Sequence, residues 1–201
     1  TDTGKVIWDT AMGGPITTSP TITGGLVVFN SSDGNVYSLN ARTGKKGWAV
    51  QFAADPSLVP PVYDGTTLYI AAGDTLYGLD PNNGSKRSTI KLPTNILIPP
   101  TVSSDSVYVI TQTNELYALT LAGRKRWSVT LDAAETAPPL LAGSLLLVAT
   151  QPGVLSGYDA GSGKLVWRYA VQASATDSQP KYPSTTVYAA PIVAAGTLYV
   201  V

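Results

Sequence analysis

Hydrophobic residues in this chain form short runs separated by turn residues, without the stripes typical of amphipathic helices. The runs, such as 26–30, 68–72 and 106–110, are rich in Val, Ile, Leu and Tyr, and are bounded by Gly, Asp, Asn or Pro. Such runs are typical of β-strands. No window places apolar residues at helical spacing over three turns. The dipeptides Asp33-Gly34 and Asn83-Gly84 are typical of tight turns between strands. The pattern therefore predicts an all-β protein.

The runs recur with a fixed period, which tryptophan marks most clearly. Trp8, Trp48, Trp127 and Trp167 are separated by 40, 79 and 40 residues. The step of 79 divides into 40 and 39 at Ser88, where the surrounding pattern continues without a tryptophan. Four short strands in each period of about 40 residues predict the blades of a β-propeller, each a four-stranded antiparallel sheet.

The copies can be aligned over the whole chain. They predict one propeller domain over residues 1–201, with repeats at approximately 11–48, 49–88, 89–127, 128–167 and 168–201. Pro-Pro pairs open three of the copies at the entry to the innermost strand, where a missing N–H costs little.

Two segments carry a resemblance to a known family. A hairpin of the form Leu-Tyr-x-Leu-Asp, followed by Thr-Gly-x-x-x-Trp, resembles the PQQ-like (quinoprotein) β-propeller repeat, which includes the BamB-type propellers. The best matches are residues 36–48 and 158–167. The resemblance implies that the tryptophans dock the outer strand of one blade against the next blade. These structural residues are Trp8, Trp48, Trp127 and Trp167. Ser88 departs from the motif, so a weaker contact is expected beside that blade.

The two ends of the chain carry incomplete repeats. Residues 4–10 correspond to a fourth strand, whereas 190–194 and 197–201 correspond to a first and a second strand. Together they would form a blade that lacks its third strand. Propellers that resemble this family usually have seven or eight blades, which favours a slice of a larger propeller. The alternative is a five-bladed ring closed by one incomplete blade.

Composition agrees with a folded domain outside the cytoplasm. The chain is 44% hydrophobic and 13% charged, and its formal net charge is zero. An average soluble domain is about 25% charged. No apolar run is long enough for a direct membrane span. The basic residues are spread and balanced by acids, which argues against a nucleic-acid partner. With the resemblance, the low charge favours the bacterial periplasm, outer membrane or cell surface.

The residue types limit the possible chemistry. The chain contains no His and no Cys, which excludes Ser-His-Asp and Cys-His nucleophilic sites and histidine zinc sites. Dehydrogenases that resemble this family usually carry an adjacent Cys pair and a calcium held by Glu, Asn and Asp, and the Cys pair cannot exist here. The acids Asp64, Asp80, Asp105 and Asp159 occupy repeated turn positions, where capping is the expected role. We therefore expect no catalytic residue, no cofactor and no metal; PQQ and calcium belong to the enzyme alternative.

One step of the repeat is longer than the others. Pro139 and Pro191 are 52 residues apart, against 39 to 41 for the other steps. The additional residues lie within 168–188, between an outer strand and the next inner strand. Such loops lie on one face of a propeller, and insertions there commonly mark a binding face. The alternative is a tolerated surface insertion.

The same face is expected to combine acidic groups with apolar loop residues. The predicted partner-binding residues are Leu58, Ile96, Leu97, Asp55, Asp132, Glu135, Asp177, Lys181 and Tyr182. Exposed apolar residues beside charges are typical of protein-docking surfaces. The alternative is that the apolar residues fill the central channel. Most basic residues are expected instead on the outer strands and the turns that precede them.

The sequence therefore favours a non-enzymatic scaffold that resembles BamB-type propellers and displays its loops to a protein partner. The rest of its own chain or another copy is a further possible partner, completing the ring. One alternative is a fragment of a PQQ-dependent dehydrogenase. Another is a ligand-sensing propeller attached to a membrane-anchored receptor or kinase.

Overall fold

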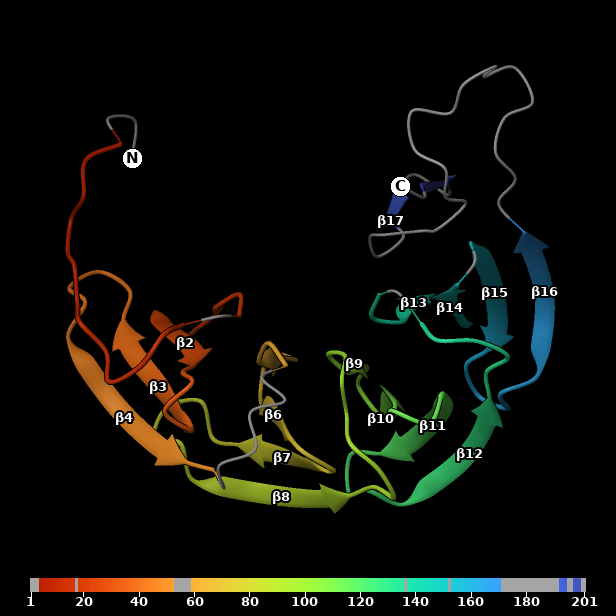
Figure 1. Cartoon of the computed structure of the whole chain (residues 1–201), viewed down its shortest axis with the longest axis horizontal. Coiled ribbons are helices and arrows are strands. Elements are labelled where there is room, and N and C mark those ends of the chain that lie inside the picture. The colour runs from red at the N-terminus through yellow and green to blue at the C-terminus, as the bar shows by residue number, and fades with distance from the viewer. Residues whose placement is uncertain are drawn as a thin grey trace. The chain divides into compact units, whose positions relative to one another are not determined.

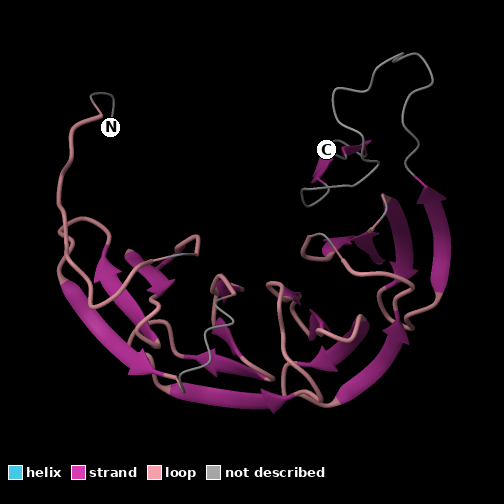
Figure 2. Cartoon of the chain, viewed as in Figure 1, coloured by secondary structure: helices cyan, strands magenta, loops and turns pink. Residues whose placement is uncertain are grey.

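The computed structural model describes residues 4–16, 18–52, 59–135, 137–151 and 153–170, and the backbone of β17 (Ile192–Ala194) and β18 (Thr197–Tyr199). Contacts divide the chain into two units, residues 1–99 and 100–201. Strands and turns make up the described residues, which include no helix (Figure 2). The described part of the chain thus holds no helix of the length and apolar character that a membrane span requires.

The first unit contains two four-stranded antiparallel sheets (Figure 1). The first sheet, here called the first blade, consists of β1 (Thr21–Thr23), β2 (Leu26–Asn30), β3 (Asn35–Asn40) and β4 (Lys46–Gln51). The second blade consists of β5 (Val62–Tyr63), β6 (Leu68–Ala72), β7 (Thr75–Leu79) and β8 (Lys86–Lys91). In each sheet the strands pair in chain order.

The second unit repeats this arrangement. The third blade along the chain is the first of this unit and consists of β9 (Thr101–Val102), β10 (Ser106–Ile110), β11 (Glu115–Thr120) and β12 (Lys125–Thr130). The fourth blade consists of β13 (Leu140–Ala142), β14 (Leu145–Thr150), β15 (Val154–Asp159) and β16 (Leu165–Ala170). Strands β17 and β18 pair antiparallel as a separate two-stranded sheet. The four sheets confirm the predicted all-β class and its four-stranded antiparallel blades.

An irregularity in strand pairing recurs at one repeat position. The register between the third and fourth strands shifts between Tyr37 and Leu39, and again at the corresponding place in the other three blades. In the first blade this places Trp48 opposite Ser38. The Ser38 hydroxyl accepts the backbone N–H of Trp48 at 2.9 Å. A bulge bends a strand and changes the direction of its side chains. Here it accompanies the turn of the tryptophan toward the next blade.

Apolar side chains fill the space between the two blades of each unit. In the first unit, Val28, Val36 and Phe52 of the first blade pack against Leu68 and its neighbours in the second. In the second unit, the corresponding core includes the following buried residues: Tyr108, Ile110, Leu116, Leu146, Val148 and Tyr158. Alternation along each strand supplies one residue in two to such a core. In β6 and β10 the intervening residues are buried as well, so these runs are almost continuously apolar.

Residues 4–10 differ from the prediction of a fourth strand. Among the described residues, no sheet ladder joins this segment to a neighbour. It is nevertheless held against the first blade, because Trp8 donates its indole N–H to the Ala41 carbonyl at 2.9 Å and Thr10 donates to the Gly44 carbonyl at 2.9 Å. A strand is defined by its pairing, and the described residues supply no third strand for this one.

Candidate partner-binding surface

The predicted surface consists of loops that follow the outer strands and of turns that join second to third strands. In the first unit, the loop after β8 is fixed to the turn of the second blade. Leu92 donates its N–H to the Asp74 carbonyl at 2.8 Å, and Ile96 donates to the Gly73 carbonyl at 2.9 Å. Two backbone hydrogen bonds therefore hold this loop in one conformation.

This anchoring separates two residues that the sequence placed together on the surface. Ile96 is 0% exposed, so the expectation that it lies on an accessible surface is wrong. Leu97 is 50% exposed. The hydrogen bond of the Ile96 amide to the turn directs its side chain inward, while the next side chain points outward. Of this pair, only Leu97 is available to a partner.

In the second unit, the loop after β12 is anchored in a similar way. Leu131 donates its N–H to the Asn114 carbonyl at 2.8 Å, and Gln151 donates to the Ala134 carbonyl at 2.9 Å. Glu135 forms an isolated bridge with Thr150 and is partly buried. Its buried Oε2 atom has no hydrogen-bond partner in the structure, and desolvation raises the pKa of this carboxyl group. Glu135 occupies the repeat position of Ile96, which explains why its carboxylate lies in a partly apolar place.

Two described acids of this face form ion pairs. Asp132 forms an ion pair with Arg168 of β16, and Asp74 pairs with Lys91 at 3.3 Å. Bonds from Thr75 and from Lys91 lower the pKa of Asp74. Arg168 is one of the basic residues that the sequence assigned to the outer strands, and in the structure it reaches an acid of the predicted surface. Leu58, Asp55, Asp177, Lys181 and Tyr182 lie outside the described residues, as does most of the long connection.

Three tryptophans make a repeated contact with the following segment of their unit. Trp8, Trp48 and Trp127 donate their indole N–H to the carbonyls of Ala41, Pro81 and Ala160, at 2.9, 3.0 and 3.0 Å. Each indole also covers a glycine of the following blade: Gly44, Gly84 and Gly163. A Cβ atom at these glycines would lie 2.6–2.7 Å from the ring. Trp167 packs over Gly157 of its own blade, and the repeat that follows it lies outside the described side chains.

The sequence reasoning missed the small residue opposite each tryptophan position. Ser38, Gly78, Ala118 and Gly157 all occupy this place in the third strand. A Cβ atom added at Gly78 would collide with Ser88, and one added at Gly157 with the Trp167 ring. The signal was present in the sequence, since these residues recur at steps of 40, 40 and 39.

The remaining acids hold turns together and do not converge on a site. Asp64 accepts the N–H groups of Thr66 and Thr67 at 2.8 and 2.7 Å. Asp80 accepts the N–H of Asn82, and Asp159 that of Ser162, each at 2.8 Å. Backbone hydrogen bonds of this kind lower the pKa of Asp80. Within the described part of the chain, no three Asp, Glu, His or Cys side chains form a group that could hold a metal ion.

Comparisons with known proteins give one matching family model and two solved structures of similar fold. The family model described as "Outer membrane protein assembly factor BamB" matches residues 1–60 and 34–201. The crystal structure of BamB from Moraxella catarrhalis aligns with a TM-score of 0.71 and 22% sequence identity, over 90% of this chain and 53% of that one. The computationally designed Ika8 protein aligns with a TM-score of 0.72 and 13% identity, over 91% of this chain and 54% of that one. No curated protein matches the chain significantly.

This chain spans about half the length of each of these two solved structures. Their low identity supports the fold, whereas the family model covers the whole sequence. This match confirms the resemblance that the motifs at residues 36–48 and 158–167 carry, and the chain belongs to the family of the outer membrane protein assembly factor BamB.

Proposed function

We propose that the chain is a non-enzymatic scaffold of the bacterial cell envelope, which binds a protein partner through the loops that follow its outer strands. The observation that carries this proposal is the family match over the whole chain. The name of that family describes a factor in the assembly of outer membrane proteins, and binding to other proteins is the shared chemistry of such a role. The location outside the cytoplasm is part of the same proposal.

The geometry of the loops supports a binding role. Both described loops are fixed by pairs of backbone hydrogen bonds to the adjacent turns. A surface that is already ordered loses little conformational entropy when a partner binds. Among the described residues, Leu97 is an exposed apolar group of this surface in the first unit. Binding would therefore depend on the rigid display of loops, and it requires no movement of the blades.

A pair of matched positions tests the surface. Leu97 and Leu165 are 50% and 45% exposed, but Leu97 lies on the predicted surface and Leu165 lies on outer strand β16. A photo-crosslinking amino acid at position 97 should capture a specific protein in a bacterial envelope extract, identified by mass spectrometry, and the same group at 165 should not. Leu97→Asp should weaken capture through other loop positions at least tenfold, whereas Leu165→Asp should not. Capture from 165 alone would assign the interface to the outer strands.

The proposal that the chain is not an enzyme has a separate test. Titration of the purified chain with PQQ and calcium should produce no calorimetric signal and no dye-linked alcohol oxidation. The reasons are the missing Cys pair and the use of Asp64, Asp80 and Asp159 in turns. A calcium-dependent affinity in the micromolar range would favour the dehydrogenase alternative.

A further inference from the structure

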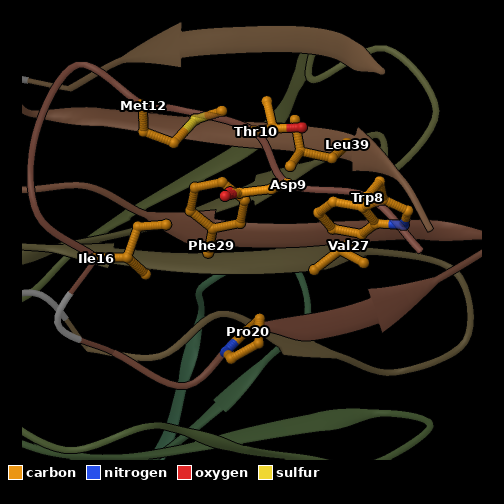
Figure 3. Close-up of a pocket in the computed structure, with 9 residues that line it drawn as sticks. All are labelled: Trp8, Asp9, Thr10, Met12, Ile16, Pro20, Val27, Phe29 and Leu39. Carbon is orange, nitrogen blue, oxygen red and sulfur yellow. The ribbon is translucent and has the colours of Figure 1, made fainter. Parts of the chain in front are cut away.

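The first unit contains a cavity next to one face of the first blade (Figure 3). Its volume is about 230 Å³, and its lining comes from residues 8–20 and from strands β2 and β3. Phe29 and Leu39 form a floor that is almost fully buried, since each is 3% exposed. Ile16, by contrast, is 48% exposed. The cavity therefore combines a buried apolar floor with a mouth that is open to solvent.

Two polar side chains of the lining are already engaged. Trp8 donates its indole N–H to the Ala41 carbonyl, and Thr10 donates its hydroxyl to the Gly44 carbonyl, each at 2.9 Å. Apart from Asp9, the rest of the lining is Met12, Ile16, Pro20, Val27, Phe29 and Leu39. These side chains carry no N–H or O–H group. A ligand in the cavity thus meets apolar surface and no free side-chain donor from this lining, which disfavours an anion.

Asp9 is the remaining polar group of the lining, and its carboxylate differs from those of the other described aspartates. Four of these form ion pairs and three accept hydrogen bonds within their turns: Asp74, Asp80, Asp105 and Asp132, and Asp33, Asp64 and Asp159. Among the described residues, Asp9 makes neither kind of contact. In the view of Figure 3, its side chain is seen beside the Phe29 ring. A negative charge without a described partner therefore lies at an apolar cavity.

The volume of the cavity limits the size of a ligand. An engineered cavity of about 150 Å³ lined by Leu, Ile and Phe binds benzene. The cavity beside the first blade is larger, so it can hold one six-membered ring and a short chain. Met12 is part of its wall, and an unbranched thioether side chain adapts readily to the shape of what it contacts.

The charge of Asp9 favours a cationic ligand over a neutral one. An ammonium group at the mouth can stay partly hydrated beside this exposed carboxylate, while an apolar body fills the floor. This arrangement avoids the cost of transferring a charge into an apolar place. The faces of Trp8 and Phe29 add to the attraction where a cation lies within about 6 Å of a ring centre. Apolar burial would supply most of the affinity, and the carboxylate would supply selectivity for a cation.

We propose that this cavity binds a small organic cation, with an aromatic or branched alkyl body on Phe29 and Leu39 and an ammonium group beside Asp9. The site shares no residue with the loops proposed to bind a protein partner, so the two proposals stand or fall separately. A neutral apolar ligand would leave the carboxylate unused. A side chain from a second copy of the chain would make occupancy of the cavity depend on protein concentration.

A single methionine makes the cavity directly observable. Met12 is the only Met of the chain, so labelling with methyl-¹³C methionine gives one NMR signal from the wall of the cavity. Titration of the full chain with 2-phenylethylammonium should shift this signal to saturation, with a dissociation constant on the order of 1 mM or below. The neutral analogue 2-phenylethanol has the same ring and chain length. It should bind roughly threefold to fivefold more weakly, because an exposed ion pair contributes little more than that.

Two variants separate the charge of the site from its volume. Asp9→Asn should make the affinities for the two probes equal within about twofold, whereas Asp132→Asn, which removes an acid outside the lining, should preserve the difference. Leu39→Phe places a larger side chain on the floor and should weaken binding of both probes by roughly fivefold or more. The fourth blade already carries a ring at this repeat position, Tyr158, so the variant is expected to fold.

Circular dichroism and the shift of the Met12 methyl signal report whether each variant has folded. If Leu39→Phe has not, Val27→Leu replaces it with the same expected direction, because Leu68 and Leu146 occupy that repeat position. No shift of the methyl signal at about 20 mM 2-phenylethylammonium would overturn the proposal. Equal binding of both probes to the parent chain would overturn the cationic ligand. Binding that the floor variant does not weaken would place the site elsewhere, and a methyl shift that follows protein concentration alone would assign the cavity to a second copy.

Discussion

The two tryptophan contacts of the first unit have the same geometry but different surroundings. At Trp48, the indole N–H bond, the covered Gly84 and a filled apolar core occur together. At Trp8, the bond and the covered Gly44 are present, but a cavity lies behind them. The comparison shows that the tryptophan contact forms locally, between one indole and one turn. Burial of the blade faces is a separate contribution, which requires whole sheets.

The largest expected effect separates these two contributions. Trp48→Ala should lower the free energy of unfolding by about 3 kcal/mol, because a large aromatic group is removed from a packed core. Trp8→Ala should cost about 1 kcal/mol, since the indole covers less apolar surface when the cavity behind it is empty. Urea unfolding of both variants measures the difference. Equal losses would show that the core behind Trp48 adds nothing to its contact.

The glycine beneath each indole gives the next effect. Gly84 has a φ of 72°, and a Cβ atom there would lie 2.7 Å from Trp48. Gly84→Ala should therefore cost about 2 kcal/mol, from backbone strain and from displacement of the indole. Gly24 has a φ of 54° and no atom within 4 Å of the added Cβ, so Gly24→Ala isolates the strain at about 1 kcal/mol.

Thermal melts of the two glycine variants should thus differ. If Gly84→Ala and Gly24→Ala were equally stable, the fit between indole and glycine would have no energetic role. The loss of stability from Gly44→Ala should lie between these two values. Residues 4–12, which carry Trp8, can move away from the first blade at lower cost than the first blade can move away from the second.

A smaller effect concerns the loop after β12, where a carboxyl group takes the position of a buried apolar side chain. Glu135 occupies the position of Ile96 and contains an unpaired, buried Oε2 atom. Desolvation raises its pKa in the folded state. The folded chain therefore holds this proton more tightly than the unfolded chain. The stability gained in this way is present below the unfolded pKa and is lost as the pH rises through the folded pKa.

Glu135→Gln should remove this dependence on pH. It should stabilise the chain by up to about 1 kcal/mol at neutral pH, where the parent carries the charge, and by less at pH 4. Urea titrations at both pH values measure this. A gain that is the same at the two pH values would assign the effect to packing, and not to the charge of the carboxyl group.

The smallest expected effect fills part of the cavity. Met12 occupies the repeat position of Phe52. The ring centroids of Phe52 and Tyr77 are 4.9 Å apart. Met12→Phe should place a ring beside Tyr37, the counterpart of Tyr77, and raise the free energy of unfolding by about 0.5 kcal/mol. The reverse change, Phe52→Met, should destabilise the filled contact by more. A loss of stability from Met12→Phe would indicate that the cavity cannot admit an aromatic ring.

The sequence by itself determined the repeat, the blade and the family resemblance. These properties depend on local patterns: alternating side chains in strands, Gly and Asx residues in turns, and a tryptophan every 40 residues. The same rules predicted that Asp64, Asp80 and Asp159 would be turn residues, because capping involves amides only two or three positions away.

Only the tertiary structure decided which loop residues are accessible and which charges are free. Ile96 and Leu97 are adjacent and both apolar, and a hydrogen bond to a turn more than 20 residues away directs one inward and leaves the other in water. Asp132 is neutralised by Arg168, which is 36 residues distant in the chain. The cavity behind Trp8 is likewise a property of faces that meet in space. Contacts of this kind depend on the packing of sheets, which the sequence pattern does not encode residue by residue.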